Sequence, residues 1–243
     1  MTQSFYVSPE QLMKDRADFA RKGIARGRSV VVLSCAEGIA LVAENPSPSL
    51  HKVGEIYDRI AFAAVGKYNE FESLRQAGVR YADLRGYAYD REDVTARGLA
   101  SVYTQSLGAV FTTEGKPFEV ELAVVEVGAT PEADRLFRLL FDGSISDQRG
   151  FVVMGGAAET IGGTLATRHD PDAGFAGAVT TAVDALRRSG GDGEDETTPR
   201  ELPAAQLEVA VLDRDPMTLR GSPRAFRRLS TDECAALLAG PGN

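Results

Sequence analysis

Two side chains in an early stretch of the chain could serve hydrolytic chemistry. Glu44 supplies a carboxylate and Lys52 an amine, close to two apolar runs of strand length. Such groups act on a substrate only beside a hydroxyl or thiol nucleophile that has its own base. Ser29 and Cys35 are the nearby candidates, although a cysteine inside an apolar run is expected to be a small core residue. Whether the chain cuts anything therefore depends on whether this stretch holds a nucleophile.

Metal and disulfide chemistry are not expected from the remaining residues. His51 and His169 have no other side chains around them at metal-ligand spacing. Two cysteines, Cys35 and Cys234, are too few for a disulfide framework, and this count fits a reducing cytoplasm. The sequence therefore predicts no bound metal, no cofactor and a cytoplasmic location.

The composition is typical of a soluble globular protein. Hydrophobic residues make up 43% of the 243 residues and charged residues 26%, which are ordinary proportions. The net charge of -8 argues against a nucleic-acid partner, because affinity for phosphates comes mainly from basic side chains. No apolar run reaches the roughly 18 residues that a membrane-spanning helix needs, and the N-terminus lacks the pattern of a secretory signal. We expect one domain over residues 1–243.

Segment 9–27 is predicted to be a helix with an explicit start. Ser8 supplies an N-cap hydroxyl, Pro9 suits the first helical position, and Gln11 is expected to complete a capping box. Gly27 lies where a helix commonly ends. Apolar residues recur along one stripe of this helix, at Met13, Ala17, Ala20 and Ile24. We expect the stripe to dock on the chain's own sheet or on a neighbouring subunit.

The rest of the chain alternates between groups of strands and pairs of helices. The predicted strands are Val30–Cys35, Ile39–Glu44, Ile56–Val65, Val120–Val127, Leu136–Phe141, Phe151–Met154, Leu207–Leu212 and Ala225–Leu229. The predicted helices are Asn69–Gly78, Asp93–Phe111, Ala158–Thr167, Ala173–Arg188 and Thr231–Leu238. Paired helices between strand groups favour an α+β fold, a four-layer αββα sandwich of two mostly antiparallel sheets with an extra N-terminal helix. Residues 189–203 are predicted to be an acidic, flexible, solvated loop.

Several strings in this order resemble an α-type subunit of the core (20S) proteasome, of the actinobacterial branch. The strings are "SPEQLMKDRADFARKGIARG", "LVAENPSPSLHKVGEIYDRIAFAAVGKYNEFESLR", "VYTQSLGAVFTTEGKPFEVELAVVEVG" and "LFRLLFDGSISDQRGFVVMGG". Together they cover nearly the full chain. The resemblance implies the fold of the N-terminal-nucleophile hydrolases, and it implies a component of a threonine-endopeptidase complex.

The same resemblance implies that this chain has no catalytic residue of its own. Catalytic relatives use an N-terminal threonine, freed by cleavage just before the first strand, whose α-amine serves as the base. Here Arg28 or Ser29 stands at that position, after a capped helix. Glu44 and Lys52 are then positions of the fold without their catalytic partner. The alternative is a processed hydrolase or catalytic proteasome-like subunit that uses Ser29, freed by cleavage after Arg28.

For Lys52, the resemblance implies a place in a pocket between neighbouring subunits. There it would pair with the C-terminal carboxylate of an activator's tail, a role that suits a compact ammonium group. Arg26 and Gly27 would form the opposite wall, with Gly27 letting the tail approach its backbone. The plainer alternatives are a solvated lysine at a strand edge and, for Arg26, a cation that complements the helix dipole.

The N-terminal tail, residues 1–8, is the other functional candidate. In the family this segment closes an axial pore, which assigns the gate to Met1, Thr2, Gln3, Ser4, Phe5, Tyr6, Val7 and Ser8. The alternative is an ordinary frayed terminus. The Tyr-Asp-Arg string of archaeal and eukaryotic tails is missing here, and Tyr57-Asp58-Arg59 lies in a predicted strand instead.

The partners implied by the resemblance are other proteins. Seven copies would form a homo-heptameric α ring on a ring of β subunits. An AAA+ proteasomal ATPase or an ATP-independent activator would dock on it, and protein substrates carrying a small ubiquitin-like tag would enter. No nucleic-acid or membrane partner is expected. A small-molecule binding module on the same layers is a further alternative, and it predicts a monomer.

Overall fold

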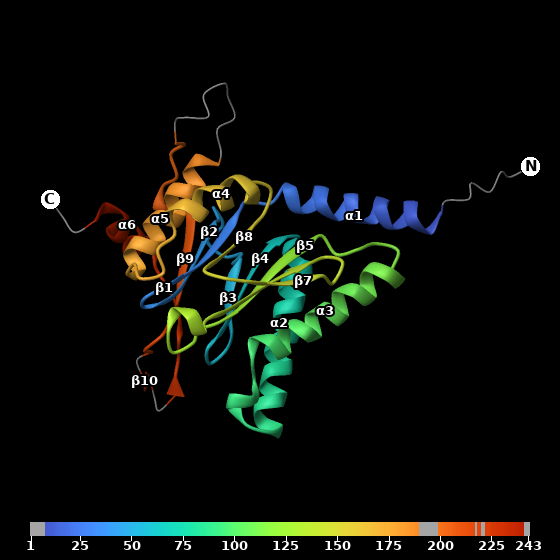
Figure 1. The fold of residues 1–243 in the computed structure, drawn as a ribbon, viewed down its shortest axis with the longest axis horizontal. Helices are drawn as coiled ribbons and strands as arrows, with labels where there is room; N and C mark the ends of the chain where they lie inside the picture. The colour runs from blue at the N-terminus through green and yellow to red at the C-terminus, as the bar shows by residue number, and fades with distance from the viewer. Residues whose placement is uncertain (1–7, 190–198, 217, 220–221, 241–243) are drawn as a thin grey trace, which may run out of the picture.

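Two five-stranded antiparallel sheets, packed face to face, form the centre of the molecule (Figure 1). The computed structural model describes residues 8–189, 199–216, 218–219 and 222–240. The first sheet has the strand order β12-β9-β2-β1-β8 and the second the order β3-β4-β5-β6-β7. The strands of the first sheet are β1 (Val30–Cys35), β2 (Gly38–Glu44), β8 (Phe151–Met154), β9 (Leu207–Asp213) and β12 (Phe226–Arg228). Those of the second are β3 (Val53–Tyr57), β4 (Ile60–Gly66), β5 (Val120–Glu126), β6 (Arg135–Leu140) and β7 (Ile145–Gln148).

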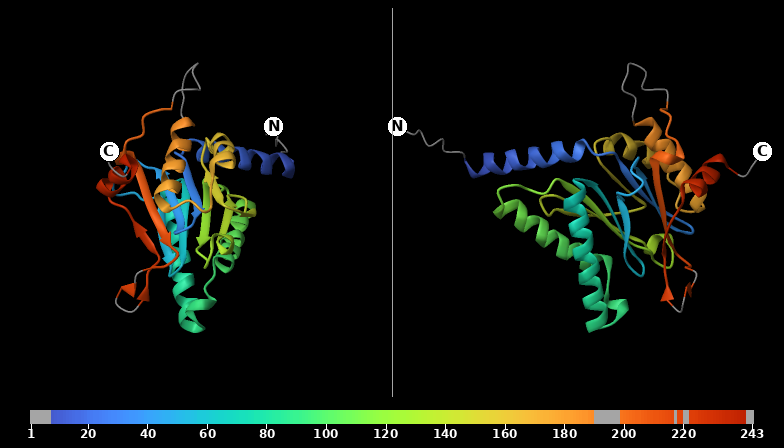
Figure 2. Two further views of the ribbon diagram at one scale, coloured as in Figure 1. Left: turned by 60° about the vertical axis from the view of Figure 1, so that its left-hand side comes forward. Right: turned by 180° about the vertical axis from the view of Figure 1, so that it is seen from behind.

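Helices cover the outer face of each sheet. Figure 2 shows the resulting layers from two further sides. On the first sheet lie α4 (Ala158–Arg168), α5 (Phe175–Arg188) and α6 (Thr231–Ala239), and on the second lie α2 (Tyr68–Ala88) and α3 (Ala96–Thr113). This arrangement confirms the predicted four-layer αββα sandwich. The short connecting elements are η1 (Arg91–Asp93), η2 (Pro131–Ala133), η3 (Ala204–Gln206), β10 (Thr218–Leu219) and β11 (Ser222–Pro223).

The hydrophobic core has three sections, one for each interface between layers. Strand β1 shows how they arise: Val30 and Val32 face the second sheet, whereas Val31 and Leu33 face the helices α4 and α5. All six residues of β1 are buried, as expected when both faces of a sheet are covered. The third section lies between the second sheet and the helices α2 and α3.

Helix α1 (Pro9–Ala25) lies outside these layers, and its N-terminal half projects beyond the sheets (Figure 1). The predicted start is confirmed, because the Ser8 hydroxyl accepts a hydrogen bond from the Gln11 amide, 3.2 Å away. The capping-box prediction is wrong, since the Gln11 side chain donates to Asp15 instead. Only the C-terminal part of the apolar stripe, at Ala20 and Ile24, is fully buried.

The structure differs from the predictions for two elements and contains one strand that the sequence analysis does not identify. The expected single strand at 56–65 is a hairpin of β3 and β4, turning at Asp58-Arg59. Helix α2 continues ten residues past Gly78, to Ala88. Strand β7 was not predicted. Within 189–203, residues 190–198 lie outside the described residues, and in the part that is described Arg200 is half-buried and Leu202 is fully buried, whereas Pro199, Glu201 and Pro203 are exposed.

Candidate functional site

The candidate site lies where α1 joins β1. Arg26 caps the C-terminal end of α1, and the Gly27 amide donates to the carbonyl of Ile24 at 2.8 Å. Lys52 reaches this connection from the loop between β2 and β3, and its ammonium group donates to the carbonyl of Arg28 at 2.7 Å. The structure therefore places the Lys52 ammonium group beside Arg28, the residue that follows Gly27.

Close backbone packing fixes the connection between α1 and β1. A Cβ atom on Gly156, in the turn after β8, would lie 2.3 Å from the carbonyl oxygen of Ala25. A Cβ on Gly27 would lie 3.0 Å from the carbonyl oxygen of Ile24 and 3.4 Å from the amide nitrogen of Gly66. Such approaches leave no room for side chains. The end of α1 is thus held by backbone contacts on two sides.

Glu44, whose carboxylate the sequence analysis considers for hydrolytic chemistry, forms an ion pair with Arg200. It ends β2, and its carboxylate accepts two hydrogen bonds from the guanidinium of Arg200, at 2.9 and 2.5 Å. Arg28 lies 3.5 Å from the same carboxylate. The hydrogen bonds from Arg200 lower the pKa of Glu44, and the nearby charges of Arg28 and Lys52 act in the same direction. Glu44 is therefore an ionised structural partner.

Partial burial gives the Lys52 ammonium group an unusually low pKa. Loss of hydration lowers the pKa of Lys52 from 10.5 to about 8, and repulsion from Arg28 contributes, against the opposing pull of Glu44 and Glu208. Among the described residues its Nζ has one hydrogen-bond partner. Because an ammonium group has three N–H donors, two remain for a ligand. The chemistry that fits is the binding of a single carboxylate.

The structure brings together only part of the predicted site. Arg26 is exposed, and its side chain forms no hydrogen bond or ion pair with another described residue, although its backbone amide donates to the carbonyl of Ile24 at the end of α1. Ser8 is the N-cap of α1, whereas Met1–Val7, the rest of the predicted gate, lie outside the described residues. The wall and the gate remain predictions.

Ser29 lies in a continuous, closely packed stretch of chain. It is 6% exposed, and its carbonyl accepts a hydrogen bond from the Glu44 amide at 3.1 Å. Helix α1 precedes it and contributes Ala20 and Ile24 to the core between the sheets. Cleavage after Arg28 would remove both residues from that core.

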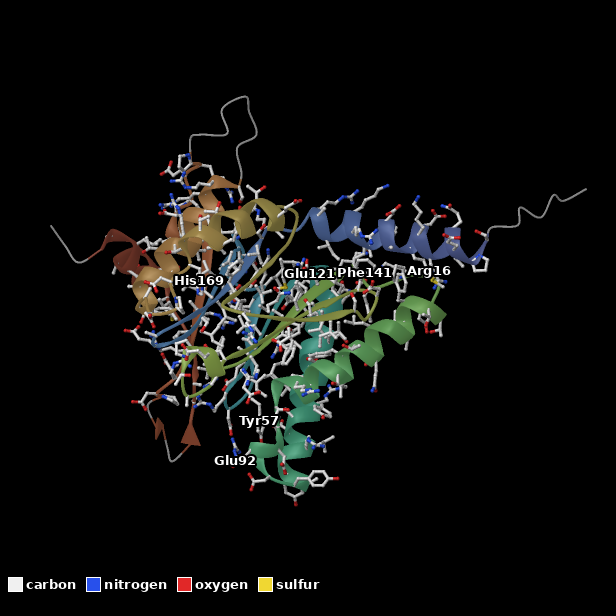
Figure 3. The ribbon with its side chains drawn as sticks, viewed as in Figure 1. Arg16, Tyr57, Glu92, Glu121, Phe141 and His169 are labelled. Atoms are coloured by element: carbon white, nitrogen blue, oxygen red, sulfur yellow. The ribbon has the colours of Figure 1, made fainter. Side chains whose placement is uncertain are left out.

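Three charged residues near this site, two of which lie inside strands, are not identified from the sequence alone. Arg200, Glu208 and Glu121 each have a buried or half-buried role near the start of β1. Glu121 pairs with Arg138, and burial raises the pKa of its carboxyl group. Figure 3 labels Glu121 below the C-terminal end of α1. A useful signal was present, since glutamate interrupts the apolar strings "VELAVV" and "LEVAVL", and a buried charge needs a partner.

Two other classes of site were searched in the described ranges. No group of three or more His, Cys, Asp or Glu side chains there is arranged to hold a metal ion. Among the described helices, none has the length and apolar character to cross a membrane. Cys35 and Cys234 are both buried, free thiols, which confirms the core position predicted for Cys35.

Comparison with known proteins supplies the class of this chain. A family model described as "Proteasome subunit" matches residues 24–202. The chain is 70% identical over 239 residues to "Proteasome subunit alpha" of Arthrobacter sp. (strain FB24), covering 98% of this chain and 99% of that protein. It is 67% identical over 243 residues to the protein of the same name from Renibacterium salmoninarum, covering 100% and 98%. For the one from Kineococcus radiotolerans the identity is 60% over 242 residues, with 100% of both chains covered.

The chain belongs to the proteasome subunit family. Within that family it is an α-type subunit of the actinobacterial branch, a non-catalytic component of the outer ring of the proteasome core. The fold described above agrees with this assignment, because two five-stranded sheets lie between layers of helices and an additional helix, α1, precedes the first strand.

Proposed function

We propose that this chain, as one domain over residues 1–243, gates the entry of substrates and docks activators through a pocket at Lys52. The observation that carries the proposal is the hydrogen bond from the Lys52 ammonium group to the Arg28 carbonyl. It puts a cation with two remaining donors directly beside the chain that leaves α1. A terminal carboxylate of an activator's tail is a ligand of matching charge and size.

In the proposed assembly, seven copies form a ring on a ring of β subunits, and the pocket lies between neighbouring copies. Two apolar side chains on α1 support contact with a neighbour, because Leu12 is 43% and Phe19 48% exposed and they lie seven residues apart on one face. Arg26, whose side chain has no described partner of its own, would face the tail together with Gly27. The activator would be an AAA+ ATPase or an ATP-independent factor.

The gate itself is assigned to residues 1–8. Its link to the pocket would run through α1, since Arg28, which accepts the hydrogen bond from Lys52, follows that helix after two residues. A tail that competes for the ammonium group would loosen this bond. The work would take place in the cytoplasm, on substrates that carry a small ubiquitin-like protein tag.

Substitution of Lys52 tests the pocket. In core particles assembled with the β subunit, K52A should abolish activator-stimulated protein degradation, because no cation remains to bind the carboxylate. Cleavage of short peptides should stay nearly intact, since the catalytic sites are on other chains. K67A is the matched control, as Lys67 at the start of α2 is ion-paired with Glu119. Loss of peptide cleavage together with protein degradation in K52A would contradict the pocket.

The alternative functions make different predictions about mass and assembly. A processed hydrolase would lose the residues before Ser29, a change visible in the intact mass of the purified protein. A small-molecule binding module would remain a monomer in size-exclusion chromatography, with or without β subunits. The proposed function predicts an unprocessed chain that assembles with β subunits.

A further inference from the structure

The loop that carries Lys52 is fastened to the first sheet by one buried carboxylate. Glu208 lies on β9, where it pairs with Ala43 of β2, and its side chain is 5% exposed. The neighbouring positions Ala210 and Leu212 on the same face of β9 belong to the core between the sheets. Because side chains alternate along a strand, Glu208 faces inward too, toward the crossing from β2 to β3.

Both oxygens of Glu208 are fully used by that crossing and its surroundings. One oxygen accepts from the backbone amide of Lys52 and from the side-chain amide of Asn45, each at 2.8 Å. The other lies 3.1 Å from Nδ1 of His51 and 3.3 Å from the Nε of Arg228. A carboxylate has about four acceptor positions, so this one has no spare capacity.

The loop closes on itself around the same point. The side-chain amide of Asn45 also donates to the carbonyl of Leu50 at 2.7 Å, and its oxygen accepts from the Ser47 amide at 3.0 Å. Arg228 donates to the carbonyl of Val53 at 2.7 Å. The residues before and after Lys52 are therefore held on both sides, and its side chain leaves a fixed backbone.

We propose that Glu208 is a positioning residue for activator docking: it fixes the backbone of Lys52 so that the ammonium group meets the terminal carboxylate of an activator's tail. This inference rests on the proposed function of Lys52. Glu208 does not contact the tail. It acts by holding the Asn45–Lys52 loop, and a charge-assisted contact depends on such placement.

E208Q is the variant that tests this role with little change in shape. An amide has one acceptor oxygen and one donor nitrogen, so the nitrogen must face either the Lys52 and Asn45 donors or the side that holds the His51 ring nitrogen and the Arg228 donor. The contacts on one side of residue 208 are then lost, and the Asn45–Lys52 loop becomes more mobile. We expect the affinity for the tail to fall by roughly tenfold, the change that corresponds to one misplaced charge-assisted hydrogen bond.

The measurement compares two synthetic peptides that copy the C-terminus of the cognate ring-shaped ATPase, one with a free carboxylate and one with a carboxamide. Their binding to α/β core particles gives a ratio that reports recognition of the carboxylate. The ratio should fall in E208Q, reach one in K52A, and fall no further in the double variant, because coupled residues are non-additive. E55Q is the control, since Glu55 binds Arg224 at the same edge of the sandwich.

Each outcome decides between the two proposals. An unchanged ratio in K52A overturns the proposed function itself. A reduced ratio in K52A with an unchanged ratio in E208Q overturns only the role of Glu208. A fall in thermal stability of E208Q without a change in the ratio assigns Glu208 a structural role alone and also overturns the inference. If E208Q fails to assemble, N45A removes the hydrogen bonds that Asn45 makes to Glu208 and to the Leu50 carbonyl and is expected to give the same fall in the ratio.

Discussion

At the scale of single residues, the protonation of Lys52 controls the proposed docking site. Without a bound tail, the Lys52 ammonium group has a pKa of about 8, whereas an exposed lysine titrates near 10.4. Below this value the group is charged and can bind a carboxylate. As the pH rises through about 8, the charge is lost in a growing fraction of sites, so the affinity should decline within a range in which ordinary lysines remain charged.

K52R provides the test of this pH dependence. An arginine side chain stays protonated across the whole range, so the affinity of the variant for the tail should be flat where that of the natural chain declines. Above the pKa the natural chain should lose up to about tenfold in affinity for each pH unit. The measurement is the binding of the carboxylate-terminated tail peptide to core particles from about pH 7 to about pH 9.5. A parallel decline in both proteins would contradict the role of the Lys52 charge.

Residue types predicted the candidate site in outline, while its supporting contacts depended on the fold. Lys52 was found because it stands before a strand in a string that resembles a known family. Its hydrogen bond to Arg28, by contrast, joins residues that are 24 positions apart, and Glu208 lies 156 positions from Lys52. No local pattern encodes such pairs, since they depend on which strands become neighbours in the sheet.

At the scale of elements, local signals worked where a residue acts through its own neighbours. The Ser8 cap was predicted correctly, because it depends on chain positions close by. Gly78 led to a wrong prediction of where α2 ends, because the helix continues past it. A Cβ on this glycine would lie 1.9 Å from the hydroxyl oxygen of Tyr103 on α3. The tertiary contact, rather than a helix end, explains the glycine.

Strands with exposed or unusual surroundings also escaped prediction. Asp58-Arg59 forms the turn between β3 and β4. Because apolar residues lie on both sides of it, the sequence predicts one continuous strand there. Strand β7 is an edge strand that pairs only with β6 among the described residues, and three of its four residues are exposed. A polar edge strand lacks the alternation that marks a half-buried one.

The docking of α1 onto the turn after β8 can be tested with one methyl group. G156A would put a Cβ 2.3 Å from the carbonyl oxygen of Ala25, so the end of α1 must shift away from the sheets. We expect a loss of about 1–3 kcal/mol in the free energy of unfolding, the usual effect of overpacking. Thermal or urea unfolding of the purified chain measures this loss.

Two glycines in the neighbouring helix are matched controls. A Cβ on Gly162 or Gly163 of α4 meets nothing within 4 Å. Alanine there should leave the stability unchanged or raise it by up to about 1 kcal/mol, because alanine favours a helix more than glycine does. Equal stability of G156A and G162A would show that the end of α1 is not held by this contact.

At the scale of the whole molecule, charged side chains join the two sheets at opposite ends of β1. Near its start, Arg228 on β12 of the first sheet donates to the carbonyl of Val53 on β3 of the second sheet. Near its end, Arg214, which follows β9, donates to the carboxylate of Asp134 ahead of β6 at 2.7 and 3.1 Å. Arg214 also donates to the carbonyl of Cys35 at 2.7 Å. The sandwich is therefore closed by charged contacts at both ends, with apolar packing between them.

The pair of Asp134 and Arg214 is buried deeply enough for its loss to be costly. The side chain of Asp134 is 1% exposed and that of Arg214 11%. Asp134 also accepts from the Ser34 hydroxyl at 2.5 Å and from the Gly128 amide at 2.8 Å. D134A would leave the guanidinium buried without its carboxylate. We expect a loss of about 3–5 kcal/mol in the free energy of unfolding, the range for breaking a buried ion pair from one side. The midpoint of urea unfolding of the full chain, with an unchanged slope, measures it.

The exposed pair of Glu55 and Arg224 separates this effect from a general loss of charge. Their side chains are 26% and 65% exposed, so solvent screens the interaction, and E55A should cost no more than about 1 kcal/mol. The two variants remove the same kind of charge, one from a buried ion pair and one from an exposed ion pair. If D134A and E55A lower the unfolding midpoint equally, burial does not set the strength of the Asp134 contact, and the closure of the sheets at the end of β1 must rest on the apolar core alone.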